Sequence, residues 1–194
     1  MDNLDGLREA VVNIVSFTDE EWAKITQAFA VKEVPAKFLL TDISVVERKL
    51  YYIVQGVARL YCIDTKGNQA TIFIFKEGNF ATSYDSFLSQ SPSQQALETL
   101  DNCKLLVIDK SNFEKLHQEI PKMNILTRFI ADQRFINAQR IFTSHIMHSP
   151  EVRYLAFERD HGDLLLRIPH QIIASFLGIT PVSLSRIRKR VLRK

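Results

Sequence analysis

The stretch that most constrains this chain is Ile168–Arg190, close to the end of its 194 residues. Apolar residues recur at helical spacing after Pro169, which suits the first turn of a helix because an N–H there has no helical partner. Gly178 follows the last of them, where a helix commonly ends in a left-handed glycine. A second helix pattern begins at once. The stretch therefore predicts a helix-turn-helix, a motif that places its second helix in the major groove of DNA.

The predicted second helix has two distinct faces. Thr180 suits the N-cap and Pro181 the first helical position. One face is apolar and carries Leu184, Ile187 and Val191. The other sides collect cations, hydroxyls and one valine: Val182, Ser183, Ser185, Arg186, Lys189, Arg190 and Arg193. The simpler interpretation is a helical hairpin with a solvated basic tail, but the capping, turn and charge signals together favour a DNA-binding helix.

The charge distribution points the same way. From Glu151 to the end there are 9 Lys and Arg against 4 Asp and Glu, a net charge of +5. The first 150 residues hold the remaining 16 and 18, a net charge of −2, and the two add to the overall +3. A nearly neutral body with a basic end fits a local contact with a polyanion.

The first part of the chain predicts an antiparallel β jelly-roll barrel. Thr18 and Glu21 form a capping-box pattern that starts a helix before it. From Val31 to Asp109, short runs rich in β-branched and aromatic residues alternate with turn signals such as Gln55-Gly56 and Lys66-Gly67-Asn68. Short strands separated by evenly spaced turns are typical of a sandwich or a jelly roll.

A long helix is predicted after the barrel. The segment Lys122–Ser149 contains neither proline nor glycine, and a helix of about 25 residues would be nearly 40 Å long. Its bulky apolar residues are too many for one covered face, which favours pairing with the same helix of a second copy. Packing against the barrel alone is the alternative. The predicted dimer interface consists of Leu126, Phe129, Ile130, Ile136 and Ile141.

The fold class expected is therefore α+β, in three regions. Residues 1–121 would form the barrel with its flanking helices, residues 122–149 the long dimerisation helix, and residues 150–194 a winged helix-turn-helix domain. Within the last region, Leu164–Ile168 is predicted to be a strand of the wing.

Composition excludes several classes of protein. With 46% apolar residues the chain can form a real core, and it has no apolar run long enough for a membrane span. The polar N-terminus does not resemble a signal peptide, so a cytoplasmic location is expected. Cys62 and Cys103 lie in separate strand-like runs and predict buried free thiols, with a disulfide or redox switch as the alternative. No metal or cofactor is predicted.

The order of barrel, long helix and winged helix-turn-helix resembles the Crp/Fnr superfamily of bacterial transcription regulators over nearly the whole chain. Leu50–Arg59 resembles the strand–Gly–strand signature of the family's sensor barrel, and Ile168–Arg188 resembles its helix-turn-helix. Ser149–Tyr154 and Gly178–Arg188 are similar to members of the Bacteroidetes type. The resemblance implies a homodimer whose partners are double-stranded DNA and RNA polymerase.

The same resemblance assigns expected DNA contacts. Arg186 falls where family members carry an arginine that reads a guanine. Val182 stands where many members have a glutamate, and valine can only touch apolar surface such as a thymine methyl group, so the target sequence should differ. Residues at helix starts are expected to hold phosphates. The full predicted set is His170, Gln171, Thr180, Val182, Ser183, Ser185, Arg186, Lys189 and Arg190.

The predicted effector region departs from the family pattern. Members that bind cyclic AMP carry a glutamate for the ribose and an arginine for the cyclic phosphate, whereas no arginine or lysine lies between Lys76 and Lys104 here. A buried phosphate without a cationic partner would lose its strongest contact, which argues against cyclic AMP. The polar residues of the cassette either line a pocket for a neutral polar ligand or only complete turns of a barrel that senses nothing: Thr82, Ser83, Tyr84, Ser93 and Gln94.

Two other classes of function fit the sequence less well. A jelly roll can be a metal-dependent cupin enzyme, but such a site needs clustered histidines, and none of the five histidines lies within Val31–Asp109. The chain is therefore not expected to be an enzyme. A sensor that acts only through protein contacts is the other alternative, against which the intact cap, turn and basic face argue.

Overall fold

The computed structural model describes residues 4–192, so Arg193 lies outside the described part. The chain divides into two compact units. The first consists of Met1–Leu60 and Ile74–Gln133, and the second of Tyr61–Phe73 and Arg134–Lys194. The long helix α5 (Lys122–Met147) contributes to both units.

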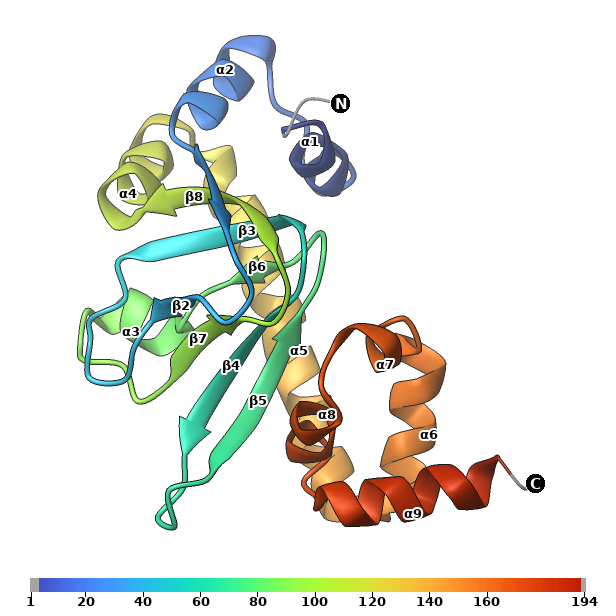
Figure 1. The fold of residues 1–194 in the computed structure, drawn as a ribbon. Helices are drawn as coiled ribbons and strands as arrows, with labels where there is room; N and C mark the ends of the chain where they lie inside the picture. Colours follow the sequence, from blue (N-terminus) through green and yellow to red (C-terminus); the bar gives the residue numbers. More distant parts are fainter. Residues whose placement is uncertain (1–3, 193–194) are drawn as a thin grey trace. The chain divides into compact units, whose positions relative to one another are not determined.

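Within the described residues, eight strands form two four-stranded sheets (Figure 1). One sheet has the order β1–β8–β3–β6 and the other β2–β7–β4–β5. Strands β1 and β8, β2 and β7, β3 and β6, and β3 and β8 pair antiparallel, so the predicted antiparallel jelly roll is confirmed. The strands are β1 (Ala30–Val34), β2 (Leu39–Thr41), β3 (Lys49–Gln55), β4 (Ala58–Ile63), β5 (Gln69–Phe75), β6 (Phe80–Ala81), β7 (Ala96–Thr99) and β8 (Cys103–Asp109).

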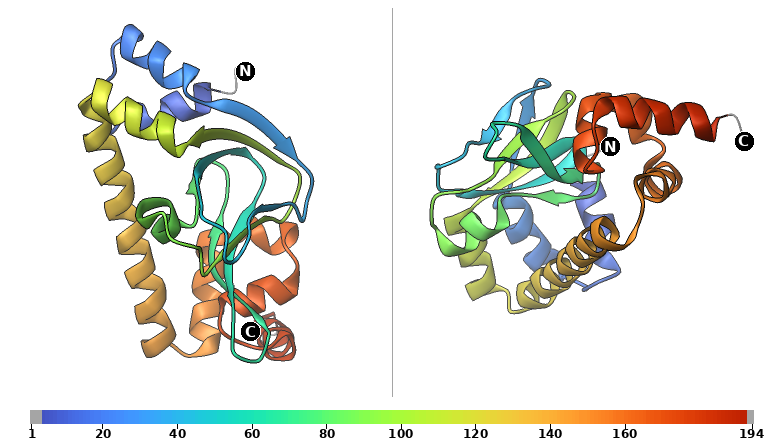
Figure 2. Two further views of the ribbon diagram at one scale, coloured as in Figure 1. Left: turned by 90° about the vertical axis from the view of Figure 1, so that its left-hand side faces the viewer. Right: turned by 90° about the horizontal axis from the view of Figure 1, so that it is seen from below.

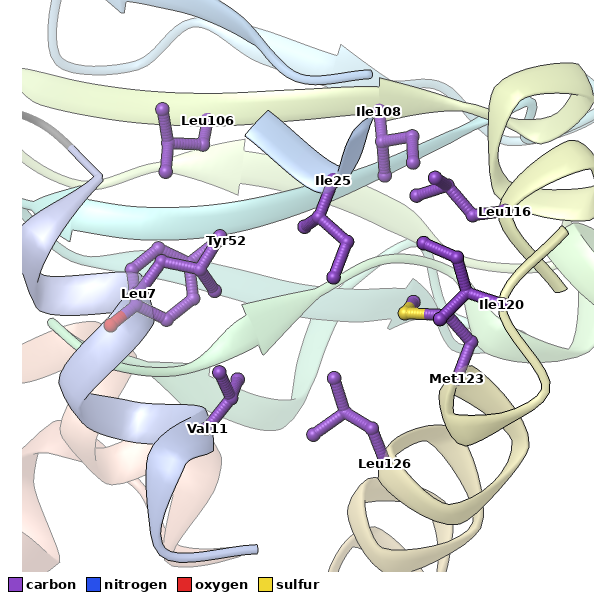
Figure 3. Close-up of a cluster of buried hydrophobic side chains, with 10 residues drawn as sticks. All are labelled: Leu7, Val11, Ile25, Tyr52, Leu106, Ile108, Leu116, Ile120, Met123 and Leu126. Carbon is purple, nitrogen blue, oxygen red and sulfur yellow. The ribbon is translucent and has the colours of Figure 1, made fainter. Parts of the chain in front are cut away.

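Four helices flank the strands of the first unit: α1 (Asp5–Val12), α2 (Asp19–Gln27), α3 (Tyr84–Ser89) and α4 (Lys110–Glu119). The predicted capping box starts α2, because the N–H of Glu21 donates to Thr18 Oγ1 at 3.2 Å and the N–H of Thr18 donates to Glu21 Oε2 at 2.8 Å. A buried cluster joins α1, α2, α4 and the start of α5 to strands β3 and β8 (Figure 3). Its members are Leu7, Val11, Ile25, Tyr52, Leu106, Ile108, Leu116, Ile120, Met123 and Leu126.

The predicted long helix is present as α5, which runs unbroken for 26 residues (Figure 2). Two of its predicted dimer residues face the barrel core instead. Leu126 belongs to the buried cluster and Ile130 packs against it. Helical periodicity identified both as apolar, but it does not tell a face that covers the chain's own core from one that covers a partner.

The second unit continues with α6 (Pro150–His161), α7 (Leu164–Arg167), α8 (His170–Phe176) and α9 (Pro181–Val191). The strand predicted at Leu164–Ile168 is wrong, since its first four residues form the helical turn α7. A short apolar run fits a strand and a buried helix equally well, and leucine is a strong helix former. Among residues 4–192 no strand follows β8, so the described helix-turn-helix has no β-hairpin wing.

Candidate nucleic-acid interface

The turn between α8 and α9 is a helix-ending motif built on Gly178. This residue has a φ of +64°, in the left-handed region that favours glycine. Its N–H donates to the Ser175 carbonyl and the N–H of Ile179 donates to the Ala174 carbonyl, both at 3.0 Å. These are the two hydrogen bonds of a Schellman motif. A Cβ at position 178 would lie 3.0 Å from Cδ2 of His145, so space as well as backbone angle favours glycine.

Helix α9 begins as the sequence predicts. The Thr180 hydroxyl accepts a hydrogen bond from the N–H of Ser183 at 3.1 Å, and Pro181 occupies the first turn. The Ser183 hydroxyl lies 2.9 Å from that of Thr180, so both hydroxyls take part in the cap. Leu184 and Ile187 are buried, which confirms the packed face.

The rest of α9 presents a cationic surface. Val182 is 61% exposed, although valine is an apolar residue. Among the described residues, Arg186 and Lys189 make no hydrogen bond or ion pair, so both charges are available to an anion. Arg190, in contrast, donates to Glu151 Oε2 at 2.8 Å. Within α9 the structure thus brings five predicted contact residues to the exposed surface: Val182, Ser185, Arg186, Lys189 and Arg190.

A concavity of about 380 Å³ lies beside this surface within the second unit. It is lined by residues from the start of α6 and from α9: Ser149, Pro150, Glu151, Ser183, Arg186, Ile187 and Arg190. Of its charged side chains, Arg190 and Glu151 pair with each other, so the charge of Arg186 is the one left uncompensated among the described lining residues.

The two residues predicted to hold phosphates at the start of α8 differ in their surroundings. Gln171 is exposed. The ring of His170 is engaged by Arg188, whose Nη1 lies 3.5 Å from Nδ1 and in close contact with Nε2. A contact between His170 and a DNA phosphate would therefore compete with the contact between His170 and Arg188.

Arg153 joins two helix ends and had no signal in the sequence pattern. Its Nε donates to the carbonyl of Leu177 at 3.0 Å, and its Nη1 donates to the carbonyl of His148 at 2.7 Å. Carbonyls at helix ends lack intrahelical partners and favour a nearby positive charge. Arg153 thus links the end of α5 to the turn of the helix-turn-helix.

The outer part of the β4–β5 hairpin belongs to the second unit and touches α8 through Ser175. The Ser175 hydroxyl accepts from the N–H of Thr71 and donates to the carbonyl of Gln69, both at 2.9 Å. The guanidinium of Arg134 lies 5.3 Å from the centre of the Phe73 ring. The hairpin is therefore attached to both α8 and α5 inside this unit.

In the first unit, the hydroxyls predicted to line an effector pocket bond one another and the backbone. The Ser83 and Ser93 hydroxyls are 2.7 Å apart, and Ser93 also donates to the carbonyl of Gln95 at 2.6 Å. The Thr82 hydroxyl donates to the carbonyl of Lys49 at 2.9 Å. These three side chains are buried, whereas the other two predicted pocket residues are half-buried or exposed: Tyr84 and Gln94.

A buried carboxylate, Glu47, lies beside this cassette. It accepts from the Thr41 hydroxyl and from the N–H of Lys49, the latter at 2.9 Å, while its own N–H donates to Ser86 Oγ at 2.9 Å. Burial raises the pKa of Glu47, and the hydrogen bonds from Thr41 and the backbone oppose that shift. Glu47 was missed because part of its environment comes from residues far along the chain: Ser86 and Gln90, 39 and 43 residues later, bond its backbone.

The barrel also contains one buried arginine, on strand β4. Arg59 donates to Glu98 Oε2 from both Nε, at 2.9 Å, and Nη2, at 2.7 Å. Its charge is thus already paired within the barrel.

Helix α5 carries an exposed apolar surface. Of the predicted interface residues, Phe129 and Ile136 are exposed and Ile141 is half-buried. The exposed apolar set is larger than predicted and consists of Ile125, Phe129, Phe135, Ile136, Phe142, Ile146 and Met147.

Within residues 4–192 no group of three or more metal-ligating side chains is present. No helix in this part of the chain is both long and apolar enough to cross a bilayer. Cys62 and Cys103 are free thiols, of which Cys103 is buried and Cys62 half-buried. Burial and the nearby Asp101 carboxylate raise the pKa of the Cys103 thiol to about 12.

The chain is similar to one protein family in sequence and to several solved structures in fold. Residues 39–119 match the cyclic nucleotide-binding domain family. FixK2 from Bradyrhizobium japonicum is similar in structure, with a TM-score of 0.76 and 13% identity over 85% of each chain. CLP from Xanthomonas campestris, described as a c-di-GMP responsive global regulator, has a TM-score of 0.73 and 15% identity over 91% of this chain and 92% of its own.

A structure from Eubacterium rectale, assigned to the crp/fnr family of transcriptional regulators, has a TM-score of 0.71 and 15% identity over 90% of this chain and 83% of its own. Among curated protein sequences none matches this chain. At these identities the structures show a common fold, and they confirm the predicted resemblance at that level. The likeness to the Bacteroidetes type stays a prediction.

Proposed function

Because the chain carries a cyclic nucleotide-binding domain and has the fold of the Crp/Fnr regulators, we propose that it is a homodimeric transcription regulator that binds specific DNA sequences. A regulator of this kind acts in the bacterial cytoplasm, which contains the chromosome. Contact with RNA polymerase is implied by the resemblance alone.

The observation that carries this proposal is the exposed face of α9, where Arg186 and Lys189 have no partner among the described residues. In a helix-turn-helix the second helix enters the major groove, where an arginine can donate two hydrogen bonds to guanine O6 and N7. Val182 would then meet a thymine methyl group. Ser185 and Lys189 would lie beside bases or backbone, with Gln171 and Ser183 near phosphates.

The exposed apolar surface of α5 supports the dimer. A row of large apolar side chains along one helix is best covered by the same helix of a second copy, because a two-fold axis makes the surface complementary to itself. Two recognition helices related in this way read half-sites about one helical turn, roughly 34 Å, apart. The operator should therefore be a pseudo-palindrome.

The barrel is proposed not to respond to cyclic AMP. The buried hydroxyls of Ser83 and Ser93 already bond each other, and the nearby sequence supplies no arginine for a phosphate. The arginine that is buried in the barrel, Arg59, is paired with Glu98. The polar residues of this cassette either line a pocket for a neutral polar ligand or only complete turns of a barrel that senses nothing. The hydrogen bond between Ser83 and Ser93 favours the second alternative.

The test is enrichment of bound duplexes from a random pool, followed by affinity measurements on the enriched and on a random duplex. Arg186→Ala should weaken binding to the enriched duplex by about 1–3 kcal/mol and affect the random duplex much less. Arg159→Ala, which removes another exposed arginine of the same unit, should change neither affinity. Equal losses on both duplexes would refute base reading by Arg186. Failure to enrich any duplex would favour a sensor that acts through protein contacts.

A further inference from the structure

The basic residues of α9 are not equivalent, and Arg188 differs from its neighbours. It is half-buried, whereas Arg186 and Lys189 are exposed. Residues four apart on an α-helix point in directions that differ by only about 40° around its axis. Arg188 therefore lies on nearly the same face of α9 as the buried Leu184. It is about 200° away from Arg186 around the helix, on the side that faces the protein.

Two side chains from other helices meet Arg188. The imidazole of His170, at the start of α8, contacts its Nη1. The phenol of Tyr154, on α6, donates to Glu158 Oε1 at 2.7 Å, and the positive charge of Arg188 favours the ionised form of that phenol and so opposes the rise in its pKa. Burial and the Glu158 carboxylate raise the pKa of Tyr154 to about 12, so the phenol stays protonated near neutral pH.

These interactions form one polar cluster across three helices. The arginine contacts the imidazole of His170 on α8 and interacts electrostatically with the phenol of Tyr154 on α6, and that phenol donates to the Glu158 carboxylate. Tyr154 is 2% exposed, so water cannot easily replace a lost partner. Buried hydrogen bonds to charged groups are costly to leave unmade.

We propose that Arg188 is a positioning residue of the DNA-binding surface, which holds α9 against α6 and α8 and so sets the direction of Arg186 without touching DNA. The inference rests on the proposed function. A side chain that reads a base tolerates only small displacements. If α9 rotated relative to α6 and α8, binding to the specific duplex would therefore weaken before binding to a random duplex. His170 then belongs to the positioning set and not to the phosphate contacts.

The test compares Arg188→Gln with Lys189→Gln on the duplex that the wild-type protein enriches and on a random duplex, over a range of salt concentrations. Lys189→Gln removes a cation from the exposed face and should lower the log–log salt slope by about 1. Arg188→Gln should leave that slope unchanged. It should weaken binding to the enriched duplex about tenfold and binding to the random duplex less than about twofold. A salt slope lowered by about 1, with equal losses on both duplexes, would make Arg188 a DNA contact and overturn the proposal.

Substitutions of His170 keep the inference testable if Arg188→Gln does not fold. His170→Gln retains an oxygen that accepts from Arg188 and should bind like the wild type, whereas His170→Ala should lose discrimination as Arg188→Gln does. Equal behaviour of the two His170 variants would overturn the proposal. A wild-type protein that enriches no duplex would instead refute the proposed function, on which this inference depends.

Discussion

The Nε of Arg153 donates to the carbonyl oxygen of Leu177 at 3.0 Å, across 24 residues of sequence. Leu177 is the last residue before Gly178, so this contact fixes the point where α8 ends. The same guanidinium also holds the carbonyl of His148, just after α5. The turn of the helix-turn-helix is therefore tied to the end of the long helix by a single side chain.

We expect Arg153→Met to lower the free energy of unfolding by about 1–3 kcal/mol, because two helix-end carbonyls lose a charged donor. Urea denaturation measures this effect. Arg159→Met is the matched control, since Arg159 pairs with Asp160 at an exposed site, and its effect should stay below about 0.5 kcal/mol. Equal effects of the two substitutions would show that the Arg153 bonds contribute little.

Gly178→Ala should destabilise the protein for two separable reasons. A left-handed conformation costs a residue with a Cβ about 1–2 kcal/mol, and the new Cβ would meet the His145 ring. Gly67→Ala separates them, because Gly67 has a φ of +83° but a Cβ added there would have no neighbouring atom within 4 Å. We expect a larger fall in melting temperature for Gly178→Ala. The difference between the two falls in melting temperature should shrink when His145→Ala is combined with Gly178→Ala. An unchanged difference would show that the new Cβ does not clash with the His145 ring.

Glu47 gives a pH dependence of defined sign. Burial raises its folded-state pKa, so the folded protein binds this proton more tightly than the unfolded chain does. Stability from this group therefore increases as the pH falls from 7 towards 5. Glu47→Gln removes the titration. Denaturation of both proteins across this range should show the wild type gaining stability relative to the variant as the pH falls, and a constant difference would contradict the prediction.

The features that were predicted correctly depend on neighbouring residues. The cap at Thr180, the turn at Gly178 and the packed Leu184 and Ile187 follow from local geometry, so one sequence suffices to find them. The strand predicted for Leu164–Ile168 failed because a run of a few apolar residues does not distinguish strand from helix.

The features that were missed depend on contacts between distant segments. Arg153 meets a carbonyl 24 residues away, and Arg188 meets a histidine 18 residues away. From the sequence alone, each of these two arginines can be identified only as a positive charge on a predicted helix. Leu126 was assigned to the dimer interface for a related reason, since the core that buries it includes residues from much earlier in the chain, such as Leu7 and Tyr52.

The surface of α5 provides the last prediction. Phe142 is 65% exposed and belongs to the apolar set that we expect a second copy to cover. Phe142→Glu would place a charge in that interface, which costs several kcal/mol when no partner compensates it. Light scattering after size exclusion should then show a monomer, with the pseudo-palindromic duplex bound far more weakly. Asn137→Glu is the matched control, because Asn137 is also exposed but lies about 140° away around the helix. It should remain dimeric, and a Phe142→Glu protein that also remains dimeric would place the interface elsewhere.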